Sequence, residues 1–450
     1  MFLQHLLSRA RHCIRLTPRL TPASYWRSST QHFSLCDRGH STGGGGQVTK
    51  DKHQIRSCLQ SSTVKISGAI KLPASSIVQV EWRDGETDVY PYVWLRDHCQ
   101  CPNCFHPTTK SRILSLEDFQ LSISPTSIQV VEDGRRVEIG WSDGHLGSYP
   151  ASWLHQRAFN THQLNLRAET IRMKQKLWGC ELSEDLPRVS FPELLENDWA
   201  LLAFLQQLEV MGLVLISQTP AQTKQCHLLS QRVAYCSRTY YGETFKVHNK
   251  TDPNNLAYTQ YSLGLHTDLP CLSYKPGVQL LHCISQIEGD GGDNLFVDSF
   301  QAAAIFRSLH PDRFNLLVKT PVVFSDTGVE DGQKFHIANQ TSVICLDEAG
   351  NIATVNMNNI CRDFINLAPA DVFGWYEALY VFSNILNHPQ NVISYKLKPG
   401  DIIVLDNMRV LHGRKGFNST SGERLLEGCY WDWDMVRSRR RVLQANLVTP

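Results

Sequence analysis

The chain has 450 residues, of which 42% are apolar and 19% are charged, and its 44 Lys and Arg against 43 Asp and Glu give a formal net charge of +1. Such a composition is typical of a folded protein with about two or three domains. The near-zero charge argues against nucleic acid or an anionic membrane surface as the main partner. No apolar run approaches the roughly 18 residues that a bilayer crossing needs, so we expect no membrane span.

The N-terminal segment differs in composition from the rest of the chain. Its first 36 residues contain five Arg and many Ser and Thr but no Asp or Glu, which is typical of a mitochondrial transit peptide. We therefore expect residues 1–60 to be a targeting leader and the protein to lie in the mitochondrial matrix. The alternative is a disordered tail on a cytoplasmic protein.

An internal repeat follows. Residues 78–95 (VQVEWRDGETDVYPYVWL) align without gaps on residues 137–154 (VEIGWSDGHLGSYPASWL). Each copy reads as a strand, an Asp-Gly turn and a returning strand, which is the strongest short-range signal for a β-hairpin. Residues 65–165 are therefore expected to form a small β-rich domain.

Residues 185–445 are expected to form a second, larger domain. A helix capped by Asn197 or Asp198 should end at Gly212 and lead into a strand over 213–216. Further helices are predicted at 222–236, 299–309 with Ser299 as cap, and 369–387. Strands are predicted at 277–284, 294–298, 320–324, 393–398, 401–405 and 424–431, with a hairpin over 342–356. Many short strands with Gly and Pro turns favour a mainly β sandwich or jelly roll with helices packed outside.

Two separated motifs suggest a metal centre. His266 and Asp268 are two residues apart at the end of a strand-like stretch, so their side chains point to the same side. His412 follows the predicted strand 401–405 in the run LDNMRVLHGR. Two imidazoles and one carboxylate on one face of an ion form the facial triad of non-haem Fe(II) oxygenases. Alone, the His-x-Asp pair is weak, because a hydrogen-bonded loop histidine would give the same pattern.

Arg424 strengthens this interpretation. It lies twelve residues after His412, at the start of the next predicted strand, where a guanidinium can bind the remote carboxylate of a dicarboxylic co-substrate. Without the upstream metal motif, a surface salt bridge would be the simpler reading.

A cysteine cluster suggests a second metal site in the smaller domain. The three thiols follow the first repeat copy, and a histidine in the turn of the second copy offers a fourth ligand: Cys99, Cys101, Cys104 and His145. Three thiolates and one imidazole form a closed, structural zinc site. The alternatives are free thiols, or His98 or His106 as the fourth ligand.

Over about residues 75–445 the chain resembles the γ-butyrobetaine dioxygenase and trimethyllysine dioxygenase family of Fe(II)- and 2-oxoglutarate-dependent hydroxylases. The matching stretches are WLRDHCQCPNC, DPNNLAYT, LHTD, PGVQLLHC, NMNNICRD, PGDIIVLDNMRVLHGR and LEGCYWDWD. The resemblance implies a double-stranded β-helix (jelly roll) catalytic domain with Fe(II) on His266, Asp268 and His412, and 2-oxoglutarate on Arg424. It also implies ascorbate as a cofactor, zinc at the cysteine cluster, and a homodimer.

The same resemblance implies a substrate pocket. Four aromatic residues occupy the positions of the family's trimethylammonium cage: Tyr241, Phe245, Tyr258 and Tyr430. Asn255 and Asn358 would donate amide hydrogens to the substrate carboxylate. The family cage usually carries Trp at position 245, and Leu269 stands where an aromatic residue is expected.

The function implied is hydroxylation of γ-butyrobetaine at C3 to give L-carnitine, with a trimethylammonium carboxylate and O2 as the small-molecule partners. The alternatives are hydroxylation of trimethyllysine, which the leader and WLRDHC favour, and a non-catalytic member that binds a trimethylammonium ligand. The basic run Arg437–Arg441 is read as a solvated helix face or a subunit contact.

Overall fold

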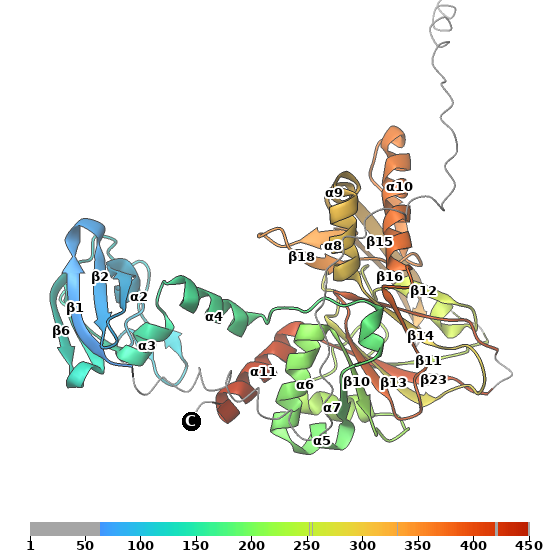
Figure 1. Cartoon of the computed structure of the whole chain (residues 1–450), viewed down its shortest axis with the longest axis horizontal. Coiled ribbons are helices and arrows are strands. Elements are labelled where there is room, and N and C mark those ends of the chain that lie inside the picture. The colour runs from blue at the N-terminus through green and yellow to red at the C-terminus, as the bar shows by residue number, and fades with distance from the viewer. Residues whose placement is uncertain (1–63, 252, 254, 331, 419–421, 449–450) are drawn as a thin grey trace, which may run out of the picture. The chain divides into compact units, whose positions relative to one another are not determined.

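The computed structural model describes residues 64–251, 253, 255–330, 332–418 and 422–448. The expected targeting leader at residues 1–60 lies outside these ranges. Among the described residues the fold is mainly β with flanking helices, as the sequence predicts (Figure 1).

Both copies of the repeat form the predicted hairpins in an N-terminal unit (residues 64–160). Each copy is a three-stranded antiparallel sheet followed by a short helix. The first comprises β1 (Ile66–Leu72), β2 (Ile77–Trp82), β3 (Thr87–Pro91) and α2 (Tyr92–Asp97), and the second β6 (Pro125–Val131), β7 (Arg136–Trp141), β8 (Leu146–Pro150) and α3 (Ala151–Gln156). The loop after α2 carries the short strands β4 (Phe105–His106) and β5 (Ser111–Arg112). The helices were not predicted.

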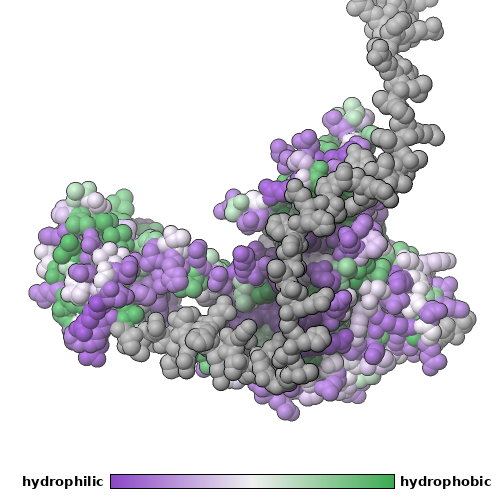
Figure 2. Space-filling view, in the orientation of Figure 1, coloured by the Kyte–Doolittle hydropathy of each residue, from purple (hydrophilic) through white to green (hydrophobic). Residues whose placement is uncertain are grey.

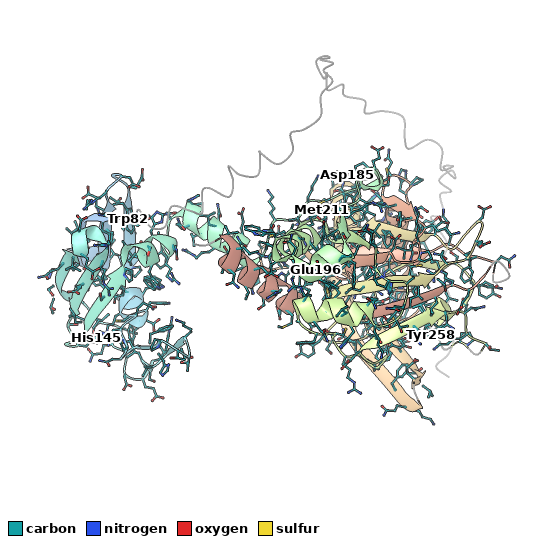
Figure 3. The ribbon with its side chains drawn as sticks, turned by 90° about the horizontal axis from the view of Figure 1, so that it is seen from below. Trp82, His145, Asp185, Glu196, Met211 and Tyr258 are labelled. Carbon is teal, nitrogen blue, oxygen red and sulfur yellow. The ribbon has the colours of Figure 1, made fainter. Side chains whose placement is uncertain are left out.

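Reciprocal hydrogen bonds join the two copies. The hydroxyl of Tyr90 donates to the carbonyl of Leu154 at 2.9 Å, and that of Tyr149 donates to the carbonyl of Leu95 at 2.8 Å. Since these four residues are equivalent in the repeat, the unit has internal two-fold character. Figure 3 labels Trp82, which precedes the first Asp-Gly turn, and His145, which follows the second, well apart in this unit.

The C-terminal unit (residues 174–448) is built on two main sheets. The larger sheet has six strands in the order β11-β23-β13-β21-β10-β9, and the smaller has four in the order β12-β22-β14-β20. The strands are β9 (Arg188–Ser190), β10 (Leu213–Ser217), β11 (Thr244–His248), β12 (Leu263–His266), β13 (Val278–Ser285), β14 (Asn294–Asp298), β20 (Val392–Tyr395), β21 (Ile402–Asp406), β22 (Val410–Arg414) and β23 (Leu425–Trp431).

The two sheets pack face to face. Apolar side chains from both sheets, among them Leu281 of β13 and Phe296 of β14, form one buried cluster between them. Burying such side chains is the main source of stability for this packing, at about 25 cal/mol per Å² of apolar surface.

Helices cover the outer faces. The helices on the outer face of the six-stranded sheet are α5 (Phe191–Glu196), α6 (Asp198–Met211), α7 (Gln225–Val233) and α11 (Trp433–Val448) (Figure 1). A second helical cluster consists of α8 (Ser299–Leu309), α9 (Pro311–Lys319) and α10 (Pro369–Leu386). It packs with β15 (Pro321–Glu330), β16 (Gln333–Ser342), β17 (Ile344–Leu346), β18 (Ile352–Val355) and β19 (Arg362–Ile365). Outside these groups, α4 (Thr161–Ile171) follows the N-terminal unit.

The predicted helix boundaries are correct for α6, which is capped by Asn197 and ends at Gly212 in the left-handed conformation. The cap of α8 was assigned one residue too late: Asp298, not Ser299, accepts the hydrogen bonds from the first turn. Helix α7 is also shorter than the predicted range 222–236.

The reading of the basic run as a solvated face is wrong for two of its residues. Arg440 is 2% exposed and its Nε lies 2.7 Å from a carboxylate oxygen of Glu209, which is itself buried on α6. Arg437 contacts the same carboxylate at 3.1 Å. These ion pairs fasten α11 to α6, because an unpaired buried carboxylate would be costly.

No helix among the described residues is long and apolar enough to cross a membrane. Hydrophilic residues make up most of the described surface visible in Figure 2, with hydrophobic patches scattered among them.

Candidate active site

His266 and His412 lie side by side although they are far apart in sequence. His266 ends β12, and antiparallel pairing of β12 with β22 places it directly opposite His412. The Nε2 atoms of the two imidazoles lie 3.2 and 3.7 Å from Oδ1 of Asp268. One ligand atom from each of the three residues lies within 4.8 Å of the others. The predicted metal residues thus meet at one point.

The protonation states suit a divalent cation. Nδ1 of His266 donates to the carbonyl of Gly264 at 2.8 Å, which leaves Nε2 directed at Asp268. Burial lowers the pKa of His412 to about 3, so this imidazole is neutral. Burial would raise the pKa of Asp268, but the neighbouring His412 and His266 outweigh it and hold that pKa well below its usual range. An ionised carboxylate and a neutral imidazole are the forms that bind metal.

Three side chains orient the Asp268 carboxylate and its backbone. Asn407, which is fully buried, accepts a hydrogen bond from the Asp268 N–H at 2.8 Å and donates to the Asp268 carbonyl at 3.0 Å. Tyr430 and Gln279 both donate to Oδ2. Oδ1 therefore remains the oxygen directed at the histidines.

The residue after the carboxylate has an unusual backbone conformation. Leu269 has a φ of +56°, in the left-handed region that side chains other than Gly, Asn and Asp rarely adopt. It is buried and lines the same pocket as Asp268. Strain of this kind persists where the surroundings fix the chain, and Asn407 provides that constraint here.

A single pocket adjoins the three metal-ligand candidates. Every other residue predicted for co-substrate or substrate also lines it: Tyr241, Phe245, Asn255, Tyr258, Asn358, Arg424 and Tyr430. The residues of β13 and β23 that contribute are alternate ones, such as Gln279, Leu281, Leu426 and Tyr430, because successive side chains of a strand point to opposite faces.

Two buried arginines lie together in this pocket. The two terminal nitrogens of Arg414 donate to the carbonyls of Ala257, Thr259 and Tyr261, and its Nε has no hydrogen-bond partner among the described residues. Arg424 is 5% exposed, and its Nε has no hydrogen-bond partner among the described residues. Burial lowers the pKa of Arg424 to about 10, so it keeps its charge at neutral pH. A buried cation of this kind suits a carboxylate ligand.

The aromatic residues form a contiguous wall. The rings of Phe245 and Tyr430 are stacked 5.2 Å apart, and those of Tyr241 and Phe245 are 6.1 Å apart. The Phe245 ring fits because its partner on β23 is Gly428, where a Cβ atom would come within 2.3 Å of the ring. The ammonium of Lys250 lies 3.9 Å from the centre of the Tyr258 ring, so this ring already faces one cation.

Both asparagines make hydrogen bonds within the protein. Oδ1 of Asn255 caps a short helical turn and its amide donates to the Tyr241 hydroxyl at 3.3 Å. The amide of Asn358 donates to the carbonyl of Thr267 at 3.0 Å. The amide bonds join segments far apart in sequence, whereas Oδ1 of each Asn accepts from the backbone N–H two residues later, a turn-type bond that Asn commonly makes. Each amide carries a second hydrogen for a ligand.

Several pocket residues were not predicted from sequence: Tyr240, Gln279, Asn294, Asp326 and Arg414. Tyr240 donates to Asp326 at 2.7 Å. The sequence of β13 held a usable signal for Gln279, because this polar residue interrupts an apolar run (VQLL). For Asp326 no local pattern distinguishes the residue from a solvated strand position.

In the N-terminal unit the cysteine cluster also comes together. Nε2 of His145 lies 3.2, 3.5 and 3.6 Å from the sulfurs of Cys99, Cys101 and Cys104 respectively. Zinc bonds of about 2.0 Å to nitrogen and 2.3 Å to sulfur give a separation of roughly 3.5 Å in a tetrahedral site. The alternative fourth ligands, His98 and His106, are not part of this group.

Comparison with known proteins agrees with this geometry. Residues 174–430 match the taurine catabolism dioxygenase TauD, TfdA family, and residues 71–155 match the N-terminal region of γ-butyrobetaine hydroxylase-like proteins. Human γ-butyrobetaine dioxygenase is 36% identical over 84% of this chain and 97% of its own length. The chain belongs to the γ-butyrobetaine and trimethyllysine dioxygenase family.

Other members of the family are similar over comparable lengths. The γ-butyrobetaine dioxygenase of Pseudomonas sp. (strain AK-1) is 31% identical over 82% of this chain and 94% of its own. Human mitochondrial trimethyllysine dioxygenase is 31% identical over 79% of this chain and 82% of its own length. This family member is therefore a 2-oxoglutarate-dependent dioxygenase that uses Fe(II), O2 and a small-molecule substrate.

Proposed function

We propose that the protein hydroxylates γ-butyrobetaine at C3 to give L-carnitine. The observation that carries the proposal is the convergence of a three-residue metal cluster, a buried arginine and an aromatic wall on one pocket. The metal ligands and the arginine suit Fe(II) and 2-oxoglutarate. The aromatic wall suits a trimethylammonium substrate, because its cation has no N–H to donate and is held by aromatic faces.

His266, Asp268 and His412 would hold the iron. The donor set fits, since two neutral imidazoles and one carboxylate leave coordination positions for other ligands. Arg424 would bind the remote carboxylate of 2-oxoglutarate. When bound together with O2, iron and 2-oxoglutarate supply the oxidant that replaces a C–H hydrogen by hydroxyl.

The chain's own contribution is positioning. Tyr241, Phe245, Tyr258 and Tyr430 would surround the trimethylammonium group, each good face contributing roughly 0.5–2 kcal/mol. Asn255 and Asn358 would fix the carboxylate end through their remaining amide hydrogens. Holding both ends of a short substrate places one C–H next to the metal, and such positioning alone accelerates reactions by orders of magnitude.

We also propose that the chain has the architecture that its family suggests. The two face-to-face sheets would form a double-stranded β-helix, preceded by a domain at about residues 65–165 and a leader at residues 1–60. The Cys99, Cys101, Cys104 and His145 cluster would hold a structural zinc ion, and Arg96 supports it through hydrogen bonds to Cys104 and Asp143. Ascorbate would maintain the iron as Fe(II). Relatives named as mitochondrial support a matrix location.

The test is a direct turnover assay. Purified protein with Fe(II), 2-oxoglutarate and ascorbate is offered γ-butyrobetaine, trimethyllysine or 4-aminobutyrate, and products are identified by mass. We expect γ-butyrobetaine to gain one oxygen, with one succinate formed per product. The Asp268→Ala variant and 4-aminobutyrate, which lacks the three methyl groups, serve as controls. Preferential hydroxylation of trimethyllysine would contradict γ-butyrobetaine as the substrate. Failure to form succinate with both γ-butyrobetaine and trimethyllysine would contradict the dioxygenase activity.

A further inference from the structure

A second group of metal-binding side chains lies in the C-terminal unit, away from the catalytic pocket. It consists of Cys226 on α7, His282 on β13 and Glu427 on β23. One ligand atom from each residue lies within 4.8 Å of the others, and all three residues are buried, at 0%, 0% and 3% exposed. His282 and Glu427 are opposite each other in the β13 and β23 pairing.

This group faces the helices, not the active site. Along β23 the alternate residues Leu426 and Tyr430 line the catalytic pocket, so Glu427 points to the other face of the sheet. Along β13, Gln279 and Leu281 face the pocket and His282 faces away. Helix α7 covers that outer face and supplies Cys226.

His282 has two buried nitrogens without a hydrogen-bond partner among the described residues. Leaving a buried polar group unpaired costs about 1–3 kcal/mol, and neutral imidazole always has one acceptor and one donor nitrogen. A metal ion bound to one nitrogen would remove part of this cost. Neither the catalytic pocket nor the cysteine cluster uses this histidine.

The other two side chains meet at the start of α7. Cys226 is the second residue of α7, and its sulfur lies 3.9 Å from the carbonyl oxygen of Glu427. One carboxylate oxygen of Glu427 accepts a hydrogen bond from the backbone N–H of Lys224 at 2.8 Å, just before the same helix. That bond leaves the second oxygen for another ligand.

We propose that Cys226, His282 and Glu427 bind a zinc ion, with a small ligand such as water in the fourth coordination position. One thiolate, one carboxylate, one neutral imidazole and Zn²⁺ have a total charge of zero, which limits the cost of burying them. Thiolate and imidazole ligands favour Zn²⁺ over Mg²⁺ and Ca²⁺. The ion would tie α7 to the outer face of the six-stranded sheet, behind the strands that carry Tyr430 and Gln279. The site is independent of the proposed substrate.

Metal analysis of the full-length protein tests the site. Zinc per chain is measured by mass spectrometry after purification from zinc-supplemented cells, for wild type, His282→Gln and Cys226→Ser. We expect each variant to lose one zinc equivalent. Cys236→Ser is the matched control, because this buried thiol lies in the same core and contacts Ser230 without belonging to the ligand group. It should retain the wild-type zinc content.

A second measurement uses only the wild-type protein, so it does not depend on whether a variant folds. Anomalous diffraction from wild-type crystals, recorded above and below the zinc absorption edge, should show a peak between the three side chains. Zinc content unchanged in both ligand variants, or crystals grown with zinc that show no peak there, would overturn the proposal.

Discussion

The hydroxyl of Tyr430 donates a hydrogen bond of 2.7 Å to Oδ2 of Asp268. Tyr430 thus belongs to the aromatic wall and also orients the carboxylate of one candidate metal ligand. Under the proposed function, binding of the substrate cation and orientation of the iron ligand would be coupled through this ring.

Removing only this hydroxyl separates the two roles. Tyr430→Phe keeps the aromatic face but loses a hydrogen bond to a charged group, which contributes roughly 1.5–3 kcal/mol. We expect Fe(II) affinity to fall by about tenfold or more and KM for γ-butyrobetaine to change less than threefold, measured by anaerobic titration and steady-state kinetics. A large rise in KM with unchanged iron affinity would show that the hydroxyl serves the substrate instead.

Asn407 should be essential for iron binding although it is not a candidate ligand. Asn407→Ala removes both hydrogen bonds to the Asp268 backbone, and loss of such a supporting residue typically lowers metal affinity by about 10–100-fold. Asn356→Ala is the control: Asn356 is also buried and hydrogen-bonded, but to Ser342 and Thr341. If both variants bind Fe(II) equally, the effect of Asn407 is only on folding.

The two pocket arginines should respond differently to substitution. Lysine keeps the charge but loses bidentate geometry. Arg424→Lys should therefore raise KM for 2-oxoglutarate by at least about tenfold. Arg414→Lys should chiefly lower Tm, because Arg414 already donates to three carbonyls. A larger rise in KM for 2-oxoglutarate in Arg414→Lys than in Arg424→Lys would show that Arg414, not Arg424, binds the co-substrate.

The cage position with the smaller ring should be improvable. Tryptophan is a better cation-binding face than phenylalanine, so Phe245→Trp should lower KM for γ-butyrobetaine by about two- to fivefold. Phe335→Trp is the control, since the Phe335 ring lies 4.5 Å from the Tyr240 ring, in a tilted arrangement, but does not line the pocket. A higher KM for Phe245→Trp would mean that the ring over Gly428 has no room for the larger side chain.

Stability of the metal-free protein should fall in mild acid. Burial lowers the pKa of His282 to about 4 and that of His412 to about 3, against about 6.5 in the unfolded chain. Both remain neutral when folded and take up a proton on unfolding below pH 6.5. Above that pH they are neutral in both states and leave the free energy of unfolding unchanged. As the pH falls from 6.5 towards 4 and 3, proton uptake by the unfolded chain lowers the free energy of unfolding. Urea unfolding between pH 7.5 and 5 should show a steeper loss for wild type than for His282→Gln, and equal slopes would contradict the assignment.

Sequence reasoning was most successful where structure is local. The Asp-Gly hairpins, the Asn197 cap and the Gly212 stop follow from turn and capping chemistry within a few residues. The residues predicted for the site also line one pocket in the structure: spacing pointed to the metal ligands and Arg424, and the family resemblance supplied the aromatic and Asn positions.

The contacts that hold these residues in place were not predictable. Asn407 binds Asp268 across two distant segments, and Arg440 meets Glu209 through the packing of two helices. Such partners depend on tertiary structure, which composition and periodicity do not encode. For the same reason the run at 437–441 was read as solvated although it is partly buried.

The most direct test of the central claim is an anaerobic titration of metal-free protein with Fe(II) in the presence of 2-oxoglutarate. Chelation of a keto acid by Fe(II) produces a visible charge-transfer absorption. We predict that the band saturates at one equivalent of iron in wild type and is absent in His412→Ala. Development of the same band at the same stoichiometry in His412→Ala would contradict the claim that His266, Asp268 and His412 hold the iron.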